Sequence, residues 1–295
     1  MVPTNRLLWI LCAFSLLSLL MIPAPSYAES VLAKIERTGQ LTAGVREDVA
    51  PFGFYDKNSN WVGFSVDVAQ SLAGELSKKF NKPIQVVKKS VNSKTRIPLV
   101  VNGEIDIEIG TTTITLAREE TIDFSLPFFI TGAKFITHKG SGIKEVGDLA
   151  GKRVGVAQGT HHAKNIEMAV SKGLIKSKCE IVQFEDHAKG FLGLTQGKVD
   201  AYFTDESQLF GQKKKAPNPG DWVIVGPFLS YEPYGFILPQ NDSPWRDFVN
   251  AFLVHLIKSG EFYSLYDKWM GPKSEVPMPM SEDYQYYLKV ITFPE

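Results

Sequence analysis

The chain has 295 residues, 44% of them hydrophobic, with 32 basic and 32 acidic side chains. This content is sufficient for the core of one large or two medium domains, and it excludes a disordered or fibrous chain. The balanced charge gives no indication of a nucleic-acid partner.

Residues 1–28 have the pattern of a secretory signal peptide. Arg6 precedes an apolar run over 7–22, and the small residues Ser26 and Ala28 suit cleavage after Ala28. The alternative is a retained membrane anchor, because this run is near the lower limit for spanning a bilayer. Cleavage would leave a periplasmic chain with 31 basic and 32 acidic side chains. Its one cysteine, Cys179, excludes a disulfide framework.

The first part of the mature chain alternates helix and strand patterns. We predict strands over 40–45 and 84–87 and a short helix over 30–37. A second helix, capped by Ser65, has apolar residues at a spacing of four that form a buried stripe: Val68, Leu72, Leu76 and Phe80. A third helix begins within 91–99, where Asn92 or Ser93 can cap it and Arg96 lies within one turn of the cap.

The stretch 103–120 carries the strongest indication of a binding site. Isoleucines at 105, 107 and 109 alternate with acidic residues, which predicts a strand with one buried face that ends at Gly110. Four threonines follow, and Thr115 can cap a short helix with Arg118 in its first turn. Arginine and threonine together suit a carboxylate. The alternative is a capped surface turn in which Arg118 pairs with Glu119 or Glu120.

Three arginines share one structural context. Arg46, Arg96 and Arg118 each stand at or just beyond a predicted strand end. In an open parallel α/β sheet these ends line one crevice, where ligands bind, so we expect the three side chains to converge. Three unrelated, solvated surface arginines are the alternative.

Near residue 131 the pattern restarts. We predict strands over 133–137, 153–157, 180–184 and 199–204, helices over 143–149, 161–172 and 186–196, and delivery of Asp205 at the end of the last strand. The chain returns near 232 to a strand over 235–238 and to amphipathic helices near the C-terminus. We therefore predict two α/β lobes joined by two hinge strands, with lobe 1 formed by 29–131 plus 232–295 and lobe 2 by 132–231.

With these elements placed, the sequence resembles the periplasmic amino-acid-binding proteins of ABC importers, the type 3 solute-binding family, from about Ile35 to Trp269. The motifs that carry the resemblance are 63–69, 106–119, 122–125, 149–156 and 197–201. Within the family it looks most like the glutamate/aspartate-binding proteins, because 45–47, 93–99 and 186–187 match that branch. The resemblance implies a periplasmic-binding-protein type II-like fold, a monomer, delivery of the ligand to the membrane subunits of an ABC transporter, and no cofactor.

The resemblance also implies roles for single residues. Arg118 would hold the α-carboxylate of the ligand with Thr113 and Thr160. Asp205 would take the α-ammonium with Thr111 or the Gly110 carbonyl. The side-chain carboxylate would lie among four residues: Arg46, Ser93, Arg96 and His187. If Arg46 or Arg96 instead pairs with a protein acid, the ligand range would broaden to acidic and neutral amino acids.

Three other functions compete with binding and import. A dehydratase-like enzyme on this fold would use His187, Asp205 or Glu206, although no nucleophile elbow or Cys-His pair is present. His161 and His162 together with His187 could suggest a metal, but adjacent histidines on a helix point about 100° apart, so we expect none. A receptor module that reports ligand to a membrane sensor would use the same bound form as an importer, and the sequence does not separate the two.

Overall fold

The computed structural model describes residues 29–292. The predicted signal peptide and its cleavage site lie outside the described residues. The chain from Val31 onward forms one compact unit. Within the described range no helix has the length and apolar character that a membrane crossing requires.

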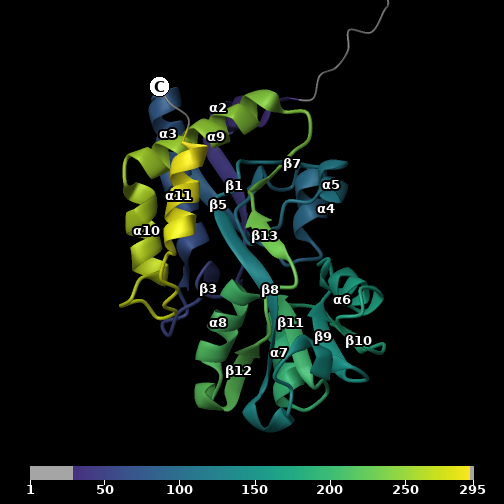
Figure 1. The fold of residues 1–295 in the computed structure, drawn as a ribbon. Helices are drawn as coiled ribbons and strands as arrows, with labels where there is room; N and C mark the ends of the chain where they lie inside the picture. The colour runs from purple at the N-terminus through teal and green to yellow at the C-terminus, as the bar shows by residue number, and fades with distance from the viewer. Residues whose placement is uncertain (1–28, 293–295) are drawn as a thin grey trace, which may run out of the picture. The chain divides into compact units, whose positions relative to one another are not determined.

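The first sheet has five strands in the order β5-β1-β6-β14-β7 (Figure 1). Its strands are β1 (Gln40–Val45), β5 (Gln85–Ser90), β6 (Ile107–Glu108), β7 (Asp123–Phe124) and β14 (Ile237–Leu238). β1 pairs in parallel with β5 and β6, whereas β14 pairs antiparallel with β6 and β7. The sheet is therefore parallel on one side and antiparallel on the other, not purely parallel.

Helices cover this sheet through apolar stripes. In α3 (Phe64–Phe80), the predicted residues Val68, Leu72 and Leu76 are fully buried. The predicted cap is wrong, because α3 begins one residue earlier than Ser65 and Gly63 is its N-cap. The remaining helices of this part of the chain are α2 (Val31–Thr38), α4 (Arg96–Val101) and α5 (Leu116–Glu119).

The second sheet has the strand order β10-β9-β11-β8-β12. Its strands are β8 (Phe129–His138), β9 (Arg153–Ala157), β10 (Glu180–Phe184), β11 (Ala201–Asp205) and β12 (Trp222–Val225). β9 pairs in parallel with β10 and β11, while β8 runs antiparallel to β11 and β12. The helices around it are α6 (His162–Ser171), α7 (His187–Thr195) and α8 (Glu206–Lys215).

Two strands run between the sheets. The first half of β8 pairs with β13 (Tyr231–Tyr234), and the second half of β8 belongs to the second sheet. Figure 1 shows β8 and β13 side by side in this crossing position. The threonine stretch is attached to the same crossing, because Thr113 forms a bridge with Tyr234. The hinge strands therefore touch the residues that we expect to bind ligand.

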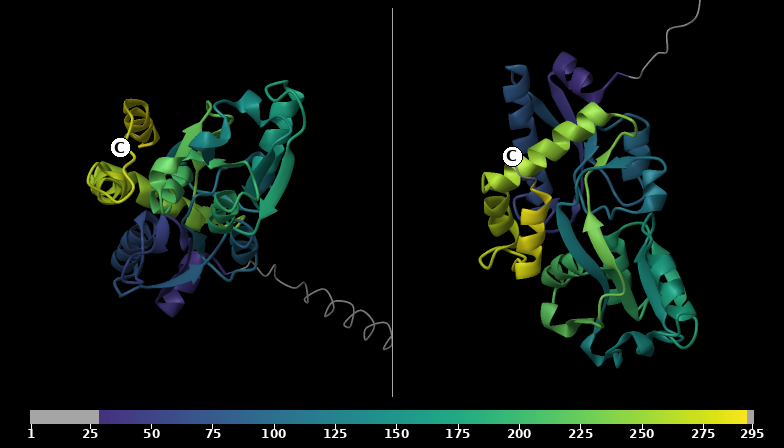
Figure 2. Two further views of the ribbon diagram at one scale, coloured as in Figure 1. Left: turned by 90° about the horizontal axis from the view of Figure 1, so that it is seen from below. Right: turned by 45° about the horizontal axis from the view of Figure 1, so that its top comes forward.

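The C-terminal helices return to the first sheet. They are α9 (Ser243–Lys258), α10 (Glu261–Met270) and α11 (Glu282–Ile291). α9 and α10 pack against α3, as the green-to-yellow and blue helices show in Figures 1 and 2. α11 is fastened to the start of the crossing, since the Tyr284 hydroxyl donates to the Phe128 carbonyl at 2.6 Å.

Several sequence-based predictions are incomplete. The stretch predicted as a helix over 143–149 forms only a short 3₁₀ turn (Val146–Leu149). A small three-stranded sheet of β2 (Asp48–Val49), β3 (Gly53–Tyr55) and β4 (Trp61–Val62) occupies a segment that we predicted only as turn-rich. The sequence pattern also missed α8, α11 and β12. The lobe boundaries at 131/132 and 231/232 stay a prediction.

Candidate functional site

The carboxyl ends of the parallel strands in both sheets face one polar cavity. β1, β5 and β6 lead to the arginine and threonine segments, while β9, β10 and β11 lead to Thr160, His187 and Asp205. Such strand ends are the usual ligand position in α/β sheets. The lining contains eight of the ten residues predicted to bind ligand: Ser93, Arg96, Thr111, Thr113, Arg118, Thr160, His187 and Asp205.

Arg118 is positioned by the threonine segment. The Thr115 hydroxyl accepts a hydrogen bond from the Arg118 backbone N–H at 3.3 Å, which confirms the predicted cap of α5. The guanidinium donates to the Thr113 carbonyl at 2.6 Å and to the Gly159 carbonyl at 3.4 Å. Arg118 therefore lines the cavity and makes no ion pair with Glu119 or Glu120 in the described part of the chain, so the surface alternative is wrong.

Arg96 is a buried cation. Its guanidinium donates to the Thr111 carbonyl at 3.1 Å and to the Thr112 hydroxyl at 2.5 Å, while its Nε finds no partner among the described residues. Burial and the positive charge of Arg118 lower the pKa of Arg96 to about 9, so the group remains charged at neutral pH. A buried guanidinium held only by neutral oxygens favours an anionic partner.

Glu108 lies beside these cations. Sequence alternation predicted one buried face for this strand, but Asp106 and Glu108 are as buried as the isoleucines, which is a correction. Thr112 donates to one Glu108 oxygen at 2.8 Å, and no described group bonds the other. Burial raises the pKa of Glu108, and the positive charge of Arg96 opposes this rise.

Arg46 does not line the cavity. Its Nε and one terminal nitrogen hold both oxygens of Asp48 at 2.9 and 2.8 Å, and the other terminal nitrogen donates to Ser93 Oγ at 3.1 Å. This bidentate pair neutralises the charge of Arg46 inside the protein. Arg46 thus meets the alternative stated for it, pairing with a protein acid, and it reaches the cavity only through Ser93.

Gly110 is also outside the lining. A Cβ at this position would lie 2.1 Å from Glu108 Oε1. Glycine is needed there because the chain passes close to that carboxyl. The role in binding an α-ammonium that we predicted for its carbonyl remains a prediction.

His187 is buried and neutral. Burial and the nearby charge of Arg46 lower its pKa to about 3, so the imidazole is uncharged at neutral pH. Its Nε2 lies 3.3 Å from Ser93 Oγ and its Nδ1 lies 3.0 Å from the Tyr202 hydroxyl. His187 therefore holds the Ser93 hydroxyl at the cavity and brings no charge to it.

Asp205 carries the negative charge of the cavity. Burial alone would raise its pKa, but the charge and hydrogen bond of His162 and the hydrogen bond of Tyr234 outweigh it and lower the pKa to about 2. The contacts are 2.9 Å to His162 Nε2, 2.6 Å to the Tyr234 hydroxyl and 3.0 Å to Gln208 Nε2. The carboxylate is thus held rigidly at the end of β11.

Sequence reasoning missed His161, His162 and Gln208 as lining residues. Gln208 stands three residues after Asp205, on α8, a helix that we did not predict. With that helix predicted, the i, i+3 spacing would have placed Gln208 beside Asp205. The histidines directly follow Thr160, and we discounted them on helical geometry alone. Their position directly after Thr160 is the sequence signal that indicates them as lining residues.

The two sides of the cavity touch. Ser93 meets His187, Thr111 meets Gln208 at 3.3 Å, and Arg118 meets Gly159. Gly159 has a φ of +73°, and a Cβ there would lie 2.4 Å from the Ser93 carbonyl oxygen, so glycine permits this approach. The cavity has a volume of about 10 Å³. A small molecule would enter only when these segments separate.

Two α/β sheets joined by crossing strands, with a polar cavity between the strand ends, define the type II fold of the periplasmic solute-binding proteins. The structure of an ancestral arginine-binding protein bound to arginine matches with a TM-score of 0.70 and 32% identity, covering 79% of this chain and 99% of that chain. The chain belongs to the bacterial extracellular solute-binding proteins, family 3, whose family model matches residues 41–272.

Two further relatives are named for the amino acids that they bind. The chain is 36% identical over 256 residues to a glutamate/aspartate import solute-binding protein of Salmonella typhimurium, with coverage of 85% of this chain and 82% of that protein. It is 37% identical to a glutamine-binding protein of Geobacillus stearothermophilus, with coverage of 71% and 76%. The family resemblance seen in the sequence is thereby confirmed.

Proposed function

We propose that this protein captures an acidic L-amino acid, glutamate or aspartate, outside the cytoplasmic membrane and delivers it to the membrane subunits of an ABC transporter. The observation that carries the proposal is a pair of guanidinium groups, Arg96 and Arg118, that face one cavity without an ion pair to any carboxylate of the described residues. A dicarboxylate supplies one anionic group for each.

Each half of the ligand has a chemically matched partner. Arg118 with Thr113 and Thr160 suits the α-carboxylate, and Asp205 suits the α-ammonium. Arg96, with Ser93 and neutral His187, suits the side-chain carboxylate. Gln208 Nε2 donates to both the Thr111 hydroxyl and the Asp205 carboxylate. This shared contact supports a role for Thr111 in holding the ammonium.

The charge balance favours an acidic over a neutral amino acid. Arg46 is neutralised by Asp48, and His187 is uncharged. Leaving the histidines aside, the two arginines and Asp205 of the lining contribute two positive charges and one negative charge. Glutamate, with a net charge of −1, completes neutrality, whereas glutamine leaves Arg96 facing a neutral amide.

The relatives support the same choice without deciding it. A relative at 36% identity is named for glutamate and aspartate, but another is named for glutamine and a structural neighbour for arginine. The broader acidic-plus-neutral range is therefore the second candidate. It is favoured by the Arg46–Asp48 pair, which leaves one fewer arginine for the ligand.

The remaining features of the proposal follow from a binding role. We propose a monomeric periplasmic protein with a signal peptide cleaved after Ala28 and lobes divided at 131/132 and 231/232. We also propose that it returns its ligand unchanged and is no enzyme. One structural neighbour is an ancestral amino acid-binding protein that is a precursor of cyclohexadienyl dehydratase. A dehydratase-like activity is therefore the alternative that the experiment addresses.

The test is calorimetry of the mature protein, unfolded and refolded to remove any bound amino acid, against glutamate, aspartate, glutamine, asparagine and arginine. We expect glutamate and aspartate to bind roughly 10⁴-fold more tightly than the two amides, because a site built around particular hydrogen bonds rejects an analogue that leaves its polar groups unpaired. NMR of the recovered ligand should show it unchanged. Equal affinities for glutamate and glutamine would refute the acidic specificity, and a converted ligand would favour an enzyme.

A further inference from the structure

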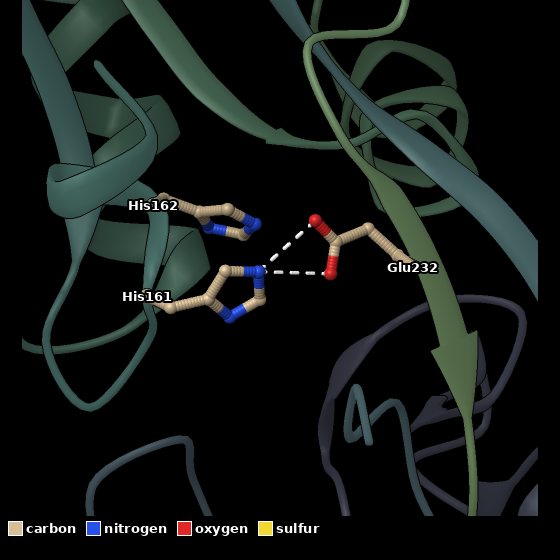
Figure 3. Close-up of side chains that lie close together, drawn as sticks. All are labelled: His161, His162 and Glu232. Carbon is tan, nitrogen blue, oxygen red and sulfur yellow. Dashed lines mark hydrogen bonds and ion pairs between the residues drawn. The ribbon is translucent and has the colours of Figure 1, made fainter. Parts of the chain in front are cut away.

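A second group of side chains converges at the edge of the same cavity. His161 and His162 come from the start of α6, and Glu232 comes from the crossing strand β13. Figure 3 shows both imidazole rings directed toward the carboxylate. His161 Nε2 lies 2.9 and 3.0 Å from the two carboxylate oxygens, and one ligand atom of each of the three residues lies within 4.8 Å of the others.

The backbone explains why neighbouring histidines share a target. His161 is the N-cap of α6, with a φ of −93° and a ψ of 5°, and His162 is the first helical residue. The 100° rotation between successive residues applies inside a helix. It does not apply across this boundary, and the ring centroids lie 5.0 Å apart. The geometric argument made from the sequence against a shared ion therefore does not apply to this pair.

We propose that His161, His162 and Glu232 bind a divalent first-row transition-metal ion such as Zn²⁺ or Ni²⁺. A tetrahedral ion with bonds of about 2.0–2.2 Å to nitrogen and oxygen holds its ligand atoms about 3.3 Å apart. The His161–Glu232 contacts at 2.9 and 3.0 Å need to open by a few tenths of an ångström. The longest separation in the group is at most 4.8 Å, so it needs to close by no more than about 1.5 Å.

The surroundings prepare the carboxylate for this role. Glu232 is fully buried, and its oxygens accept hydrogen bonds from Thr113 Oγ1 at 2.6 Å and from Ser230 Oγ at 2.5 Å. Such outer contacts fix the orientation of a ligating carboxylate. Its remaining lone pairs face the histidines. A buried carboxylate whose neighbours are hydroxyls and imidazoles gains from a cation beside it.

The arrangement also leaves a route for the ion. The His161 side chain is 24% exposed, while His162 and Glu232 are almost completely buried. Asp205 lies 2.9 Å from His162 Nε2 and can provide a fourth ligand or accept from a metal-bound water. Three protein ligands and one adjustable position form a common zinc arrangement.

The ligand set selects the class of ion. Two imidazole nitrogens favour zinc, nickel, copper and cobalt, whereas magnesium and calcium prefer an all-oxygen set. The three proposed ligands are not among the residues assigned to the amino acid, and the test needs no amino acid.

The test uses the untagged, chelator-treated mature protein without amino acid. Calorimetry with ZnCl₂ and NiCl₂ should give one ion per chain, and CoCl₂ should give visible absorption bands of a nitrogen-ligated ion. His161→Gln and His162→Gln should each weaken Zn²⁺ binding by at least about 10-fold. MgCl₂ in excess should not compete.

The matched control is His255→Gln, which removes an imidazole that is 63% exposed and lies on α9. This variant should keep the affinity and the cobalt spectrum. Of the cluster variants, His161→Gln carries the smallest risk of a folding defect, because the His161 side chain is the most exposed of the three. Zinc binding that is absent in the unmodified protein, or that falls equally in His255→Gln and the cluster variants, would overturn the proposal.

Discussion

Replacing Arg96 by methionine is the sharpest test of the ligand model. The change keeps an unbranched side chain of similar length and removes the guanidinium. We expect glutamate binding to weaken by about 3–5 kcal/mol, because one partner of a buried ion pair is lost and the ligand carboxylate stays uncompensated. Since 1.4 kcal/mol is a factor of ten, the dissociation constant should rise by between about 10² and 10³·⁵.

The size of the effect rests on the burial of Arg96. Its side chain is 2% exposed, and burial with the nearby positive charges already lowers its pKa to about 9. Glutamine would lose a hydrogen bond to a charged group, about 1.5–3 kcal/mol, and no ion pair. The glutamate-to-glutamine affinity ratio should therefore narrow by about tenfold.

The fold should survive this substitution. Arg96 donates only to Thr111 and Thr112 oxygens in the described chain, so the substitution breaks two hydrogen bonds and no ion pair. Thermal unfolding should confirm it. Calorimetry with glutamate and glutamine is the assay, and Arg246→Met, which removes a 40% exposed arginine on α9, is the control. Equal losses for both amino acids in Arg96→Met would refute the assignment of Arg96 to the side-chain carboxylate.

Three further predictions concern charge, pH and closure. Asp205→Asn should weaken every α-amino acid by about 3–5 kcal/mol, since the ammonium loses a buried partner; calorimetry that shows nearly unchanged affinity would sink its role. His187 has a folded pKa of about 3, below its unfolded value, so the unfolded chain binds the extra proton and stability should fall as pH drops from 6.5 toward 3; urea unfolding of His187→Gln should show a smaller decline. Small-angle scattering should show a smaller radius with glutamate, because a ligand that touches both sides favours closure, and an unchanged radius at saturation would contradict it.

Local patterns were sufficient for the frame of the site. The threonine-to-arginine turn, its Thr115 cap and the strand that ends at Asp205 are visible in spacing and capping residues, and the structure contains them. Convergence of Arg96 and Arg118 followed from the rule that ligands bind at the carboxyl ends of parallel strands. These predictions succeed because each depends on a few neighbouring residues and one topological rule.

Burial of polar groups was much harder to predict. Alternating isoleucine and acid is typical of a half-exposed strand, yet Glu108 is fully buried because the arginine segments cover its other face. The packing of distant segments decides this, and periodicity contains no information about it. The same holds for the orientation of His161 and His162, which depends on where α6 begins.

The contrast between Arg46 and Arg96 shows which electrostatic feature could have been predicted. Asp48 stands two residues after Arg46, and residues two apart in an extended chain point to the same face. No acid lies within six residues of Arg96. An arginine with a same-face acid nearby is neutralised before a ligand arrives, whereas one without such an acid keeps its charge for the ligand. The selectivity of this cavity therefore rests on Arg96 and Arg118, and Arg46 acts through the position of Ser93.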